Sequence, residues 1–581
     1  MTESQAHGAM LVRARIHPRA LDHMTRYFDA TASTVFVELI QNARRAGADR
    51  VDIVTQRTEC AAGKETTEVA VWDNGRGIAD PAVLLSFGES DWAGDLSRRE
   101  RAAGMGLACL ARRGCTVTSR AKSPSPEFAT GWRMTLESDH FLGRTSAVAA
   151  PYEMAPEPCG TCVSFHATES LNALRAAAAY AAKYAPLTVS FNGRELERRD
   201  FLEGAIRTEL WEGLTLAVIE SSCLPNASSD LNFHGLPLNV RLPFVLTLNE
   251  TIWSVRAEAV DCPELELVLP ARKEAVENAF LERLREQARL AIYRALASMD
   301  PSPSVAFGDH ARASAAGIEL PEPPAELCPW VPPSAEAHAE DHASIGRFRP
   351  VGPDAIVVTY RADPPATHPF YRAARRENLA PRLFEANRRL TGYAWYDRLP
   401  RLTGVTVHVR ADGAGCTLEA LRQRLREARD NGAPFDPQVR VEGIVMTVEI
   451  ARPDGVQFTC HYPADVVFLD ASSGWLSDAE PVIAVDSDID AEDLARLLRH
   501  AYFVPCRDID ADSYDTQSDR FDDEAMHMAL NHVASPDEAT RNAIARAVRQ
   551  DIHWMFPKGR DVDILVRGEQ VLVKLRPPQG A

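Results

Sequence analysis

Two residues near the N-terminus have types and a spacing that suit catalysis. Glu38 precedes Asn42 by four positions, so on a helix both side chains project from one face, one turn apart. A carboxylate placed there can orient a water molecule, and an amide oxygen can complete the shell of a metal ion. The same pair is typical of a solvated helix surface, so the spacing alone leaves both interpretations open.

Asp73 stands in a second setting, one that suits ligand binding. It closes a short apolar run and is followed at once by Asn74, Gly75, Arg76 and Gly77. Two glycines so close together keep the backbone near whatever the carboxylate binds, and a carboxylate can accept a hydrogen bond from an exocyclic amine. The alternative is an Asp-Asn-Gly hairpin turn that binds nothing.

A third segment is rich in glycine. Gly104, Met105, Gly106 and Leu107 precede a short helix-like stretch that ends near Arg113. Backbone N–H groups at the start of a helix bind phosphate, so this segment is a candidate phosphate cradle, although a lone Gly-x-Gly is a weak signal. The polar segment before it contains glycines that can serve as hinges of a lid.

A fourth segment opens a β-rich run with Gly160 and Thr161, which places a hydroxyl beside a glycine. Its other interpretation is a plain strand. Cys159 and Cys162 in the same stretch have the spacing of a redox or zinc pair. Because a second such pair is lacking, we expect core thiols instead.

Local patterns place the first two motifs on defined elements. Cap residues at 31–33, an apolar stripe at helical spacing and a following Gly47 predict a helix over residues 33–46. Two β-rich runs, 51–55 and 69–72, predict a hairpin whose second strand ends at Asp73.

The four motifs occur together and in a fixed order, at residues 38–42, 73–78, 104–107 and 160–161. In this combination they resemble the Bergerat-fold (GHKL) ATPases, which include gyrase B, heat shock protein 90, MutL, the MORC ATPases and the sensor histidine kinases. The resemblance covers about residues 20–170. It implies an α+β fold, with helices layered on a mixed β-sheet, that binds ATP with Mg²⁺.

The resemblance also implies a role for each matching residue. Asn42 would complete the Mg²⁺ shell, and Asp73 would accept from the adenine amino group. Gly77 would let adenine approach the backbone, and Thr161 would support the water network around Asp73. Gly75 and Ile78 belong to the same adenine-binding motif.

The resemblance implies that the nucleotide phosphates bind at the end of the lid, to the segment of Gly104, Met105, Gly106 and Leu107. The family often has a further glycine where this chain has Arg101. The lid is therefore less well matched than the adenine site.

The residue at position 38 distinguishes two branches of the superfamily. Hydrolysing members carry a Glu that polarises the attacking water, whereas histidine kinases usually carry Asn. Glu38 therefore favours hydrolysis. A protein kinase is the weaker alternative, because too little chain precedes Glu38 for a phosphoacceptor module, and we expect His17 and His23 to be structural or surface residues.

Residues 185–300 resemble, more loosely, the transducer domain of the hydrolysing branch. The similarity includes a helix whose apolar stripe runs from Val276 to Ala288. A lysine of this domain reaches the γ-phosphate in the family. Lys273, expected at the start of that helix, is the candidate for this lysine, and Arg272 is the alternative. That Lys273 is a solvated residue at the helix start is an equally good interpretation.

Length and composition limit the remaining classes. The chain has 581 residues, 45% hydrophobic and 25% charged, which excludes disordered and fibrous proteins and suggests two to four domains. A net charge of −18, with the larger excess of acid after residue 300, argues against a general polyanion binder. We expect no membrane segment or signal peptide, and reduced cysteines in the cytoplasm.

These observations predict four segments. They are a Bergerat-fold ATP-binding domain at 1–170, a transducer-like domain at 171–300, a Pro/Ala-rich linker at 301–345, and an α/β domain of unknown function at 346–581. In the last segment, Asp508 to Asp519 mimics a calcium loop, but Ser513 stands where the loop needs glycine, so we expect an acidic solvated loop.

The sequence thus predicts an ATPase that uses Mg²⁺ and ATP to close a lid. The resemblance alone further implies a homodimer that acts on a protein or nucleic-acid client. The alternative is a nucleotide-sensing regulatory module with little or no hydrolysis.

Overall fold

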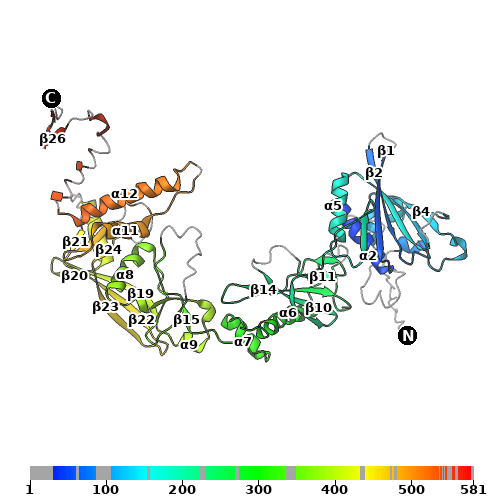
Figure 1. The fold of residues 1–581 in the computed structure, drawn as a ribbon, viewed down its shortest axis with the longest axis horizontal. Coiled ribbons are helices and arrows are strands. Elements are labelled where there is room, and N and C mark those ends of the chain that lie inside the picture. Colours follow the sequence, from blue (N-terminus) through cyan, green and yellow to red (C-terminus); the bar gives the residue numbers. More distant parts are fainter. Residues whose placement is uncertain are drawn as a thin grey trace, which may run out of the picture. The chain divides into compact units, whose positions relative to one another are not determined.

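The computed structural model describes residues 31–59, 65–86, 106–153, 158–221, 229–268, 274–334, 348–431, 439–470 and, with short gaps, 474–576. The chain divides into two compact units, Met1–Glu322 and Pro323–Ala581. Both units contain helices and β-sheets, as Figure 1 shows. The predicted α+β class is therefore confirmed.

Helix α2 (Ala32–Arg45) opens the described part of the N-terminal unit. The side chain of Thr31 caps it by accepting from the N–H of Thr34, and Gly47 follows its end in a left-handed conformation (φ +74°). The apolar stripe around Phe36 and Ile40 is buried. The helix predicted over residues 33–46 is thus confirmed, one residue earlier at each end.

The first sheet has eight strands in the order β5-β4-β3-β6-β2-β1-β7-β8. Its strands are β1 (Arg50–Glu59), β2 (Glu65–Asp73), β3 (Cys115–Arg120), β4 (Trp132–Leu136), β5 (Ala149–Pro151), β6 (Gly160–Ala167), β7 (Thr188–Phe191) and β8 (Arg194–Glu195). β1 and β2 form the predicted hairpin, and β1 also pairs in parallel with β7. Inward residues such as Val51 and Val69 share one hydrophobic core with α2 and with α5 (Leu171–Ala182).

A second sheet in the same unit has six strands, with the order β12-β11-β14-β10-β9 and β13 on β14. These are β9 (Ala205–Trp211), β10 (Leu214–Ser221), β11 (Leu231–Phe233), β12 (Leu236–Leu238), β13 (Val245–Leu246) and β14 (Ile252–Ala259). Helix α6 (Ala279–Ala297) packs on it through Phe280, Leu284 and Ala288. The predicted start of this helix was wrong: Asn278 caps it, and Val276 pairs instead with Glu266.

The predicted linker range contains regular structure. Helix α7 (Phe307–Ala315) lies within it, and Ala313 and Leu320 are buried in the core of the second sheet. Further along, β15 (Glu326–Leu327) pairs with β16 (Arg349–Pro350), and Trp330 belongs to the first core of the C-terminal unit. The predicted domain boundaries stay a prediction.

The C-terminal unit is built on a six-stranded sheet in the order β18-β17-β19-β22-β23, with β20 on β19. The same unit contains a smaller, three-stranded sheet in the order β21-β25-β24. The strands are β17 (Ile356–Val358), β18 (Leu383–Glu385), β19 (Arg401–Ala411), β20 (Ala414–Thr417), β21 (Val439–Val441), β22 (Gly443–Ala451), β23 (Gln457–Ala464), β24 (Val466–Phe468) and β25 (Pro481–Ala484). The longer helices are α8 (Pro364–Arg376), α10 (Leu418–Asp430), α11 (Ala491–Tyr502) and α12 (Tyr514–Val533).

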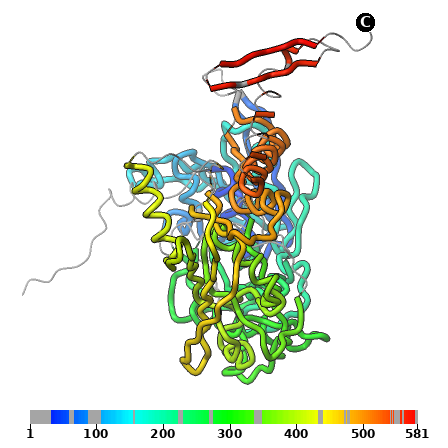
Figure 2. The backbone as a smooth tube through the Cα atoms, turned by 90° about the vertical axis from the view of Figure 1, so that its left-hand side faces the viewer, coloured from blue at the N-terminus to red at the C-terminus, as the bar shows by residue number. Residues whose placement is uncertain are grey.

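The calcium-loop alternative is wrong. Ser513 caps α12 by accepting from the N–H of Thr516, and Asp519 lies inside that helix. The chain therefore turns helical in the middle of what would be the loop. Near the C-terminus, β26 (Val562–Arg567) and β27 (Gln570–Leu575) form an antiparallel ribbon, drawn in red in Figure 2.

None of the helices in the described ranges combines the length and the apolar composition that crossing a bilayer requires.

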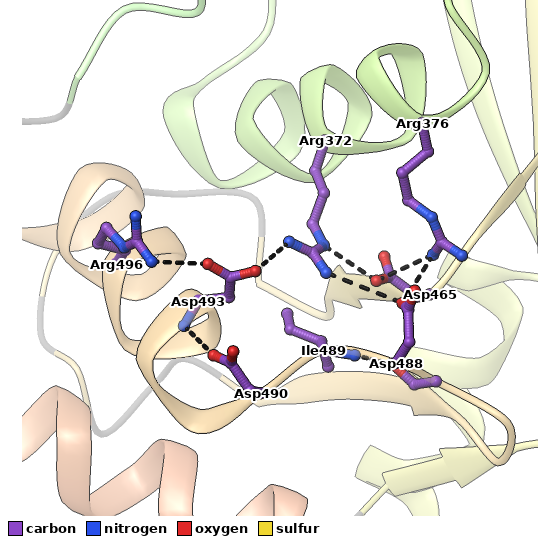
Figure 3. A network of polar contacts seen from close by, with 9 residues as sticks. Arg372, Arg376, Asp465, Asp488, Ile489, Asp490, Asp493 and Arg496 are labelled. Carbon is purple, nitrogen blue, oxygen red and sulfur yellow. Dashed lines mark hydrogen bonds and ion pairs between the residues drawn. The ribbon is translucent and has the colours of Figure 1, made fainter.

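A network of charged side chains holds the C-terminal unit together (Figure 3). Asp465, only 4% exposed, accepts from Arg372 Nε at 2.9 Å and pairs with Arg376 Nη1 at 3.0 Å. The same Arg372 donates through Nη1 to Asp493 at 2.9 Å, in the first turn of α11. The network therefore joins α8 to α11 and to the chain between β23 and β24.

We expect Asp465→Ala to destabilise the C-terminal unit by about 3 kcal/mol, because removing one partner leaves the half-buried guanidinium of Arg372 without its buried carboxylate. Arg496→Ala is the control. It breaks a pair with Asp493 whose arginine is 65% exposed, so the loss should stay below about 1 kcal/mol. Hydrogen exchange of α8 and α11 in urea measures both. Equal losses would contradict a structural role for the buried pair.

Candidate functional site

Helix α2 presents Glu38 and Asn42 one turn apart on the same face. Glu38 is 6% exposed, so the interpretation as solvated surface is wrong for this residue. Asn42 is partly exposed, and its Oδ1 accepts from Arg45 Nη1 at 3.3 Å. The helix thus holds a carboxylate inside the protein beside an amide that solvent can reach. The catalytic role of Glu38 stays a prediction.

Asp73 is the last residue of β2 and lies opposite Thr161 of β6. Its Oδ1 accepts from the N–H of Gly75 at 2.9 Å. Burial raises the pKa of Asp73 to about 6, although hydrogen bonds from the backbone of Gly75 and Thr161 act in the opposite direction. The chain therefore keeps a poorly hydrated carboxylate at a strand end.

The glycines after Asp73 are required by close backbone contacts. A Cβ on Gly75 would lie 2.6 Å from the Cβ of Ala46, and the N–H of Arg76 donates to the carbonyl of Ala46 at 2.9 Å. A Cβ on Gly77 (φ +66°) would lie 2.0 Å from the carbonyl oxygen of Arg120. The turn is thus docked on the end of α2, which brings the two predicted motifs together.

Ser119 links the remaining predicted residues, and sequence reasoning missed it. It is fully buried, its hydroxyl donates to the carbonyl of Gly160 at 2.9 Å, and it lies 3.0 Å from Thr161 Oγ1. It also accepts from the N–H of Ile78 at 2.9 Å. Trp132 donates through Nε1 to the carbonyl of Ile78 at 2.9 Å. Ile78 and Thr161 are therefore held by one shared hydroxyl.

The glycine-rich segment is described only from Gly106 onward. Gly106 starts a 3₁₀ helix, η2 (Gly106–Leu110), which is shorter than the predicted helix to Arg113. Leu107 is half-buried against the first core. Gly104, Met105 and the predicted lid lie outside the described residues, so their roles stay a prediction.

Helix η2 packs against α2 near Glu38. Burial raises the pKa of the Cys109 thiol, and the negative charge of Glu38 raises it further. The thiol is therefore neutral. Because η2 packs near Glu38, the candidate phosphate-binding segment begins on the side of α2 that holds the candidate carboxylate.

The two thiols with the spacing of a redox or zinc pair have no metal partner in the described part of the chain. Cys159 and Cys162 are free, Cys162 is buried, and burial raises its pKa to about 12. Across the described ranges, no group of three or more His, Cys, Asp or Glu side chains converges on a metal position. The expectation of a core thiol is confirmed for Cys162.

Lys273 and Arg272 lie outside the described residues, and Lys273 is not at a helix start as predicted. The helix begins at Ala279. Instead, the N–H of Val268 donates to the carbonyl of Glu274 at 2.8 Å, which closes a loop. The roles of Lys273 and Arg272 stay a prediction.

The described residues fit an adenine nucleotide. The half-buried carboxylate of Asp73 can accept from an amino group. The Cβ position of Gly77 faces the carbonyl of Arg120, so the predicted role of Gly77 toward adenine stays a prediction. The amide oxygen of Asn42 is the kind of ligand that Mg²⁺ prefers, with nucleotide phosphates supplying others. Such an ion, when bound, would neutralise phosphate charge.

No family model and no curated protein sequence matches the chain. Solved structures that it resembles include a variant of the Aquifex aeolicus MutL ATPase domain (16% identity, 45% of this chain, 98% of that chain, TM-score 0.24). Another is the N-terminal domain of a DNA repair protein (12%, 46%, 96%, TM-score 0.27). A third is the B-subunit of DNA gyrase from Myxococcus xanthus (14%, 50%, 94%, TM-score 0.30).

At identities and TM-scores this low, the comparisons carry no argument about this chain. We therefore argue the function from the residues of the site.

The raised pKa of Asp73 makes a prediction about stability. The folded chain holds the Asp73 proton more tightly than the unfolded chain, so this contribution is present below about pH 4 and is lost as pH rises through about 6. We expect Asp73→Asn, which cannot ionise, to stabilise the first sheet at pH 8 by up to about 3 kcal/mol and to change it little at pH 4. Hydrogen exchange of β2 and β6 in urea measures the difference. Equal stability of wild type and variant at pH 8 would show that the carboxylate is well hydrated.

Proposed function

We propose that this chain is a GHKL-type ATPase that binds ATP with Mg²⁺ in its N-terminal segment and hydrolyses it to ADP and phosphate. The observation that carries the proposal is the poorly hydrated carboxylate of Asp73, in a turn docked through Gly75 and Arg76 on the end of the helix that holds the buried Glu38. An adenine amino group would replace the missing hydration of Asp73, and the phosphates would then extend toward α2.

The reaction assigns a proton acceptor to Glu38. The oxygen of a water molecule bonds to the γ-phosphorus, the bond to the bridging oxygen breaks, and ADP leaves. The attacking water loses a proton, and Glu38 is the group proposed to accept it. Burial supports this role, because it keeps bulk water away from the carboxylate. Asn42 would hold the nucleotide-bound Mg²⁺.

The remaining parts of the cycle are proposals of the same kind. Residues 87–107 would close over the phosphates, with Gly104, Met105, Gly106 and Leu107 donating backbone N–H groups. Lys273, or Arg272 in its place, would sense the γ-phosphate. A homodimer, a protein or nucleic-acid client and a cytoplasmic location complete the proposal.

The test compares Glu38→Gln with Asp73→Asn in the full chain. We expect Glu38→Gln to lower the rate of phosphate release by about 10²- to 10⁴-fold while ATP still binds, because only the proton acceptor is lost. Asp73→Asn keeps Glu38 but loses the acceptor for the adenine amine, so ATP binding itself should weaken. Steady-state phosphate release and calorimetric titration with Mg²⁺–ATP measure the two effects.

The outcomes separate the alternatives. Wild type that binds ATP tightly, without turnover and without dependence on Glu38, would favour a nucleotide-sensing regulator. Transfer of labelled γ-phosphate to protein would favour a kinase. Wild type that binds no ATP would overturn the proposed function as a whole.

A further inference from the structure

Gln41 joins the candidate helix to the second sheet. It follows Glu38 by three positions on α2 and is 5% exposed. Its Nε2 donates to the carbonyl oxygen of His234 at 2.9 Å, and its Oε1 accepts from Arg44 Nε at 3.2 Å. Because both ends of the amide are engaged, the side chain is held in one orientation.

The turn that accepts this bond is tightly packed. His234 (φ +52°) and Gly235 (φ +94°) connect β11 to β12 in left-handed conformations. A Cβ on Gly235 would lie 2.9 Å from the Cα of Ala185 and from the carbonyl oxygen of Tyr184. The turn therefore rests on the backbone that follows α5.

The same turn is connected to the middle of the second sheet. β11 pairs in parallel with β14, with Phe233 opposite Ala259. A displacement of β14 would thus reach β11 and the carbonyl of His234.

We propose that Gln41 is a positioning residue that couples the orientation of Glu38 on α2 to the position of the second sheet. The inference rests on the proposed function. Gln41 and Glu38 are one turn apart, so a small rotation of α2 moves both side chains together. A misplacement of about 1 Å at a reacting group lowers a rate by about a hundredfold. The Gln41–His234 bond therefore makes catalytic geometry depend on the second sheet.

Gln41→Glu tests the coupling with almost no change in volume. The carboxylate still accepts from Arg44, but it presents an oxygen instead of an N–H to the carbonyl of His234. We expect ATP affinity to stay within about threefold of wild type, since the Asp73 turn is untouched, and kcat to fall about ten- to a hundredfold. In wild type, Mg²⁺–ATP should slow hydrogen exchange in β11 and β12; in the variant this protection should disappear.

Arg256→Met is the matched control. Arg256 Nη1 donates to the carbonyl of Phe201 at 3.2 Å, so this variant also removes a side chain–carbonyl bond of the second sheet, but one that does not involve α2. We expect it to keep both turnover and the exchange protection. If Gln41→Glu does not fold, Gln41→Met, which lacks the donor without adding a charge, takes its place under the same criteria.

The outcomes distinguish the coupling from the proposed function. Wild type that binds no ATP overturns the proposed function. Wild type that binds ATP without any change of exchange in β11 and β12, or a Gln41→Glu protein that keeps turnover and protection, overturns the coupling. Equal loss in Gln41→Glu and Arg256→Met also overturns it, because the effect would then be a general loosening of the second sheet.

Discussion

The docking of the Asp73 turn on the C-terminal end of α2 is the contact on which the candidate site depends. A side chain on Gly75 would collide with Ala46, and the N–H of Arg76 reaches the carbonyl of that same residue. This contact brings a strand end and a helix face into one site. The carboxylate of Asp73 in this turn is poorly hydrated, and its burial raises its pKa. Carboxylates whose pKa is raised by burial are often found at functional sites.

Sequence reasoning identified the parts of this site that depend on local patterns. The stripe of α2, the hairpin and the strand end at Asp73 follow from periodicity and from glycine positions over a few residues. Ser119 could not be found in this way, because a serine within a β-rich run has no local signal. Its role arises only when β3 pairs with β6 and places it opposite Thr161, which lies far along the chain.

Sequence reasoning also missed the role of Gln41, although this residue stands inside the first motif. Its partner is a backbone carbonyl beside another sheet, and residue types do not indicate which backbone carbonyl will lie near a side chain. The start of α6 was misplaced because an apolar residue at helical spacing, Val276, also suits the extended segment that pairs with Glu266. Periodicity alone cannot separate a helix from the extended residue just before it, whereas the cap at Asn278 can.

The parallel pairing of β1 with β7 has a consequence for how the chain folds. Val51 pairs with Val189 and Asp73 pairs with Thr161, so the first sheet is held together by pairing between residues far apart in sequence. Contacts of this kind form slowly, because a long loop must be ordered before any of them is made. During synthesis, α2 and the hairpin are complete long before their partners emerge. The candidate site therefore arises late. Under the proposed function, a bound nucleotide would stabilise the finished fold rather than guide the chain toward it.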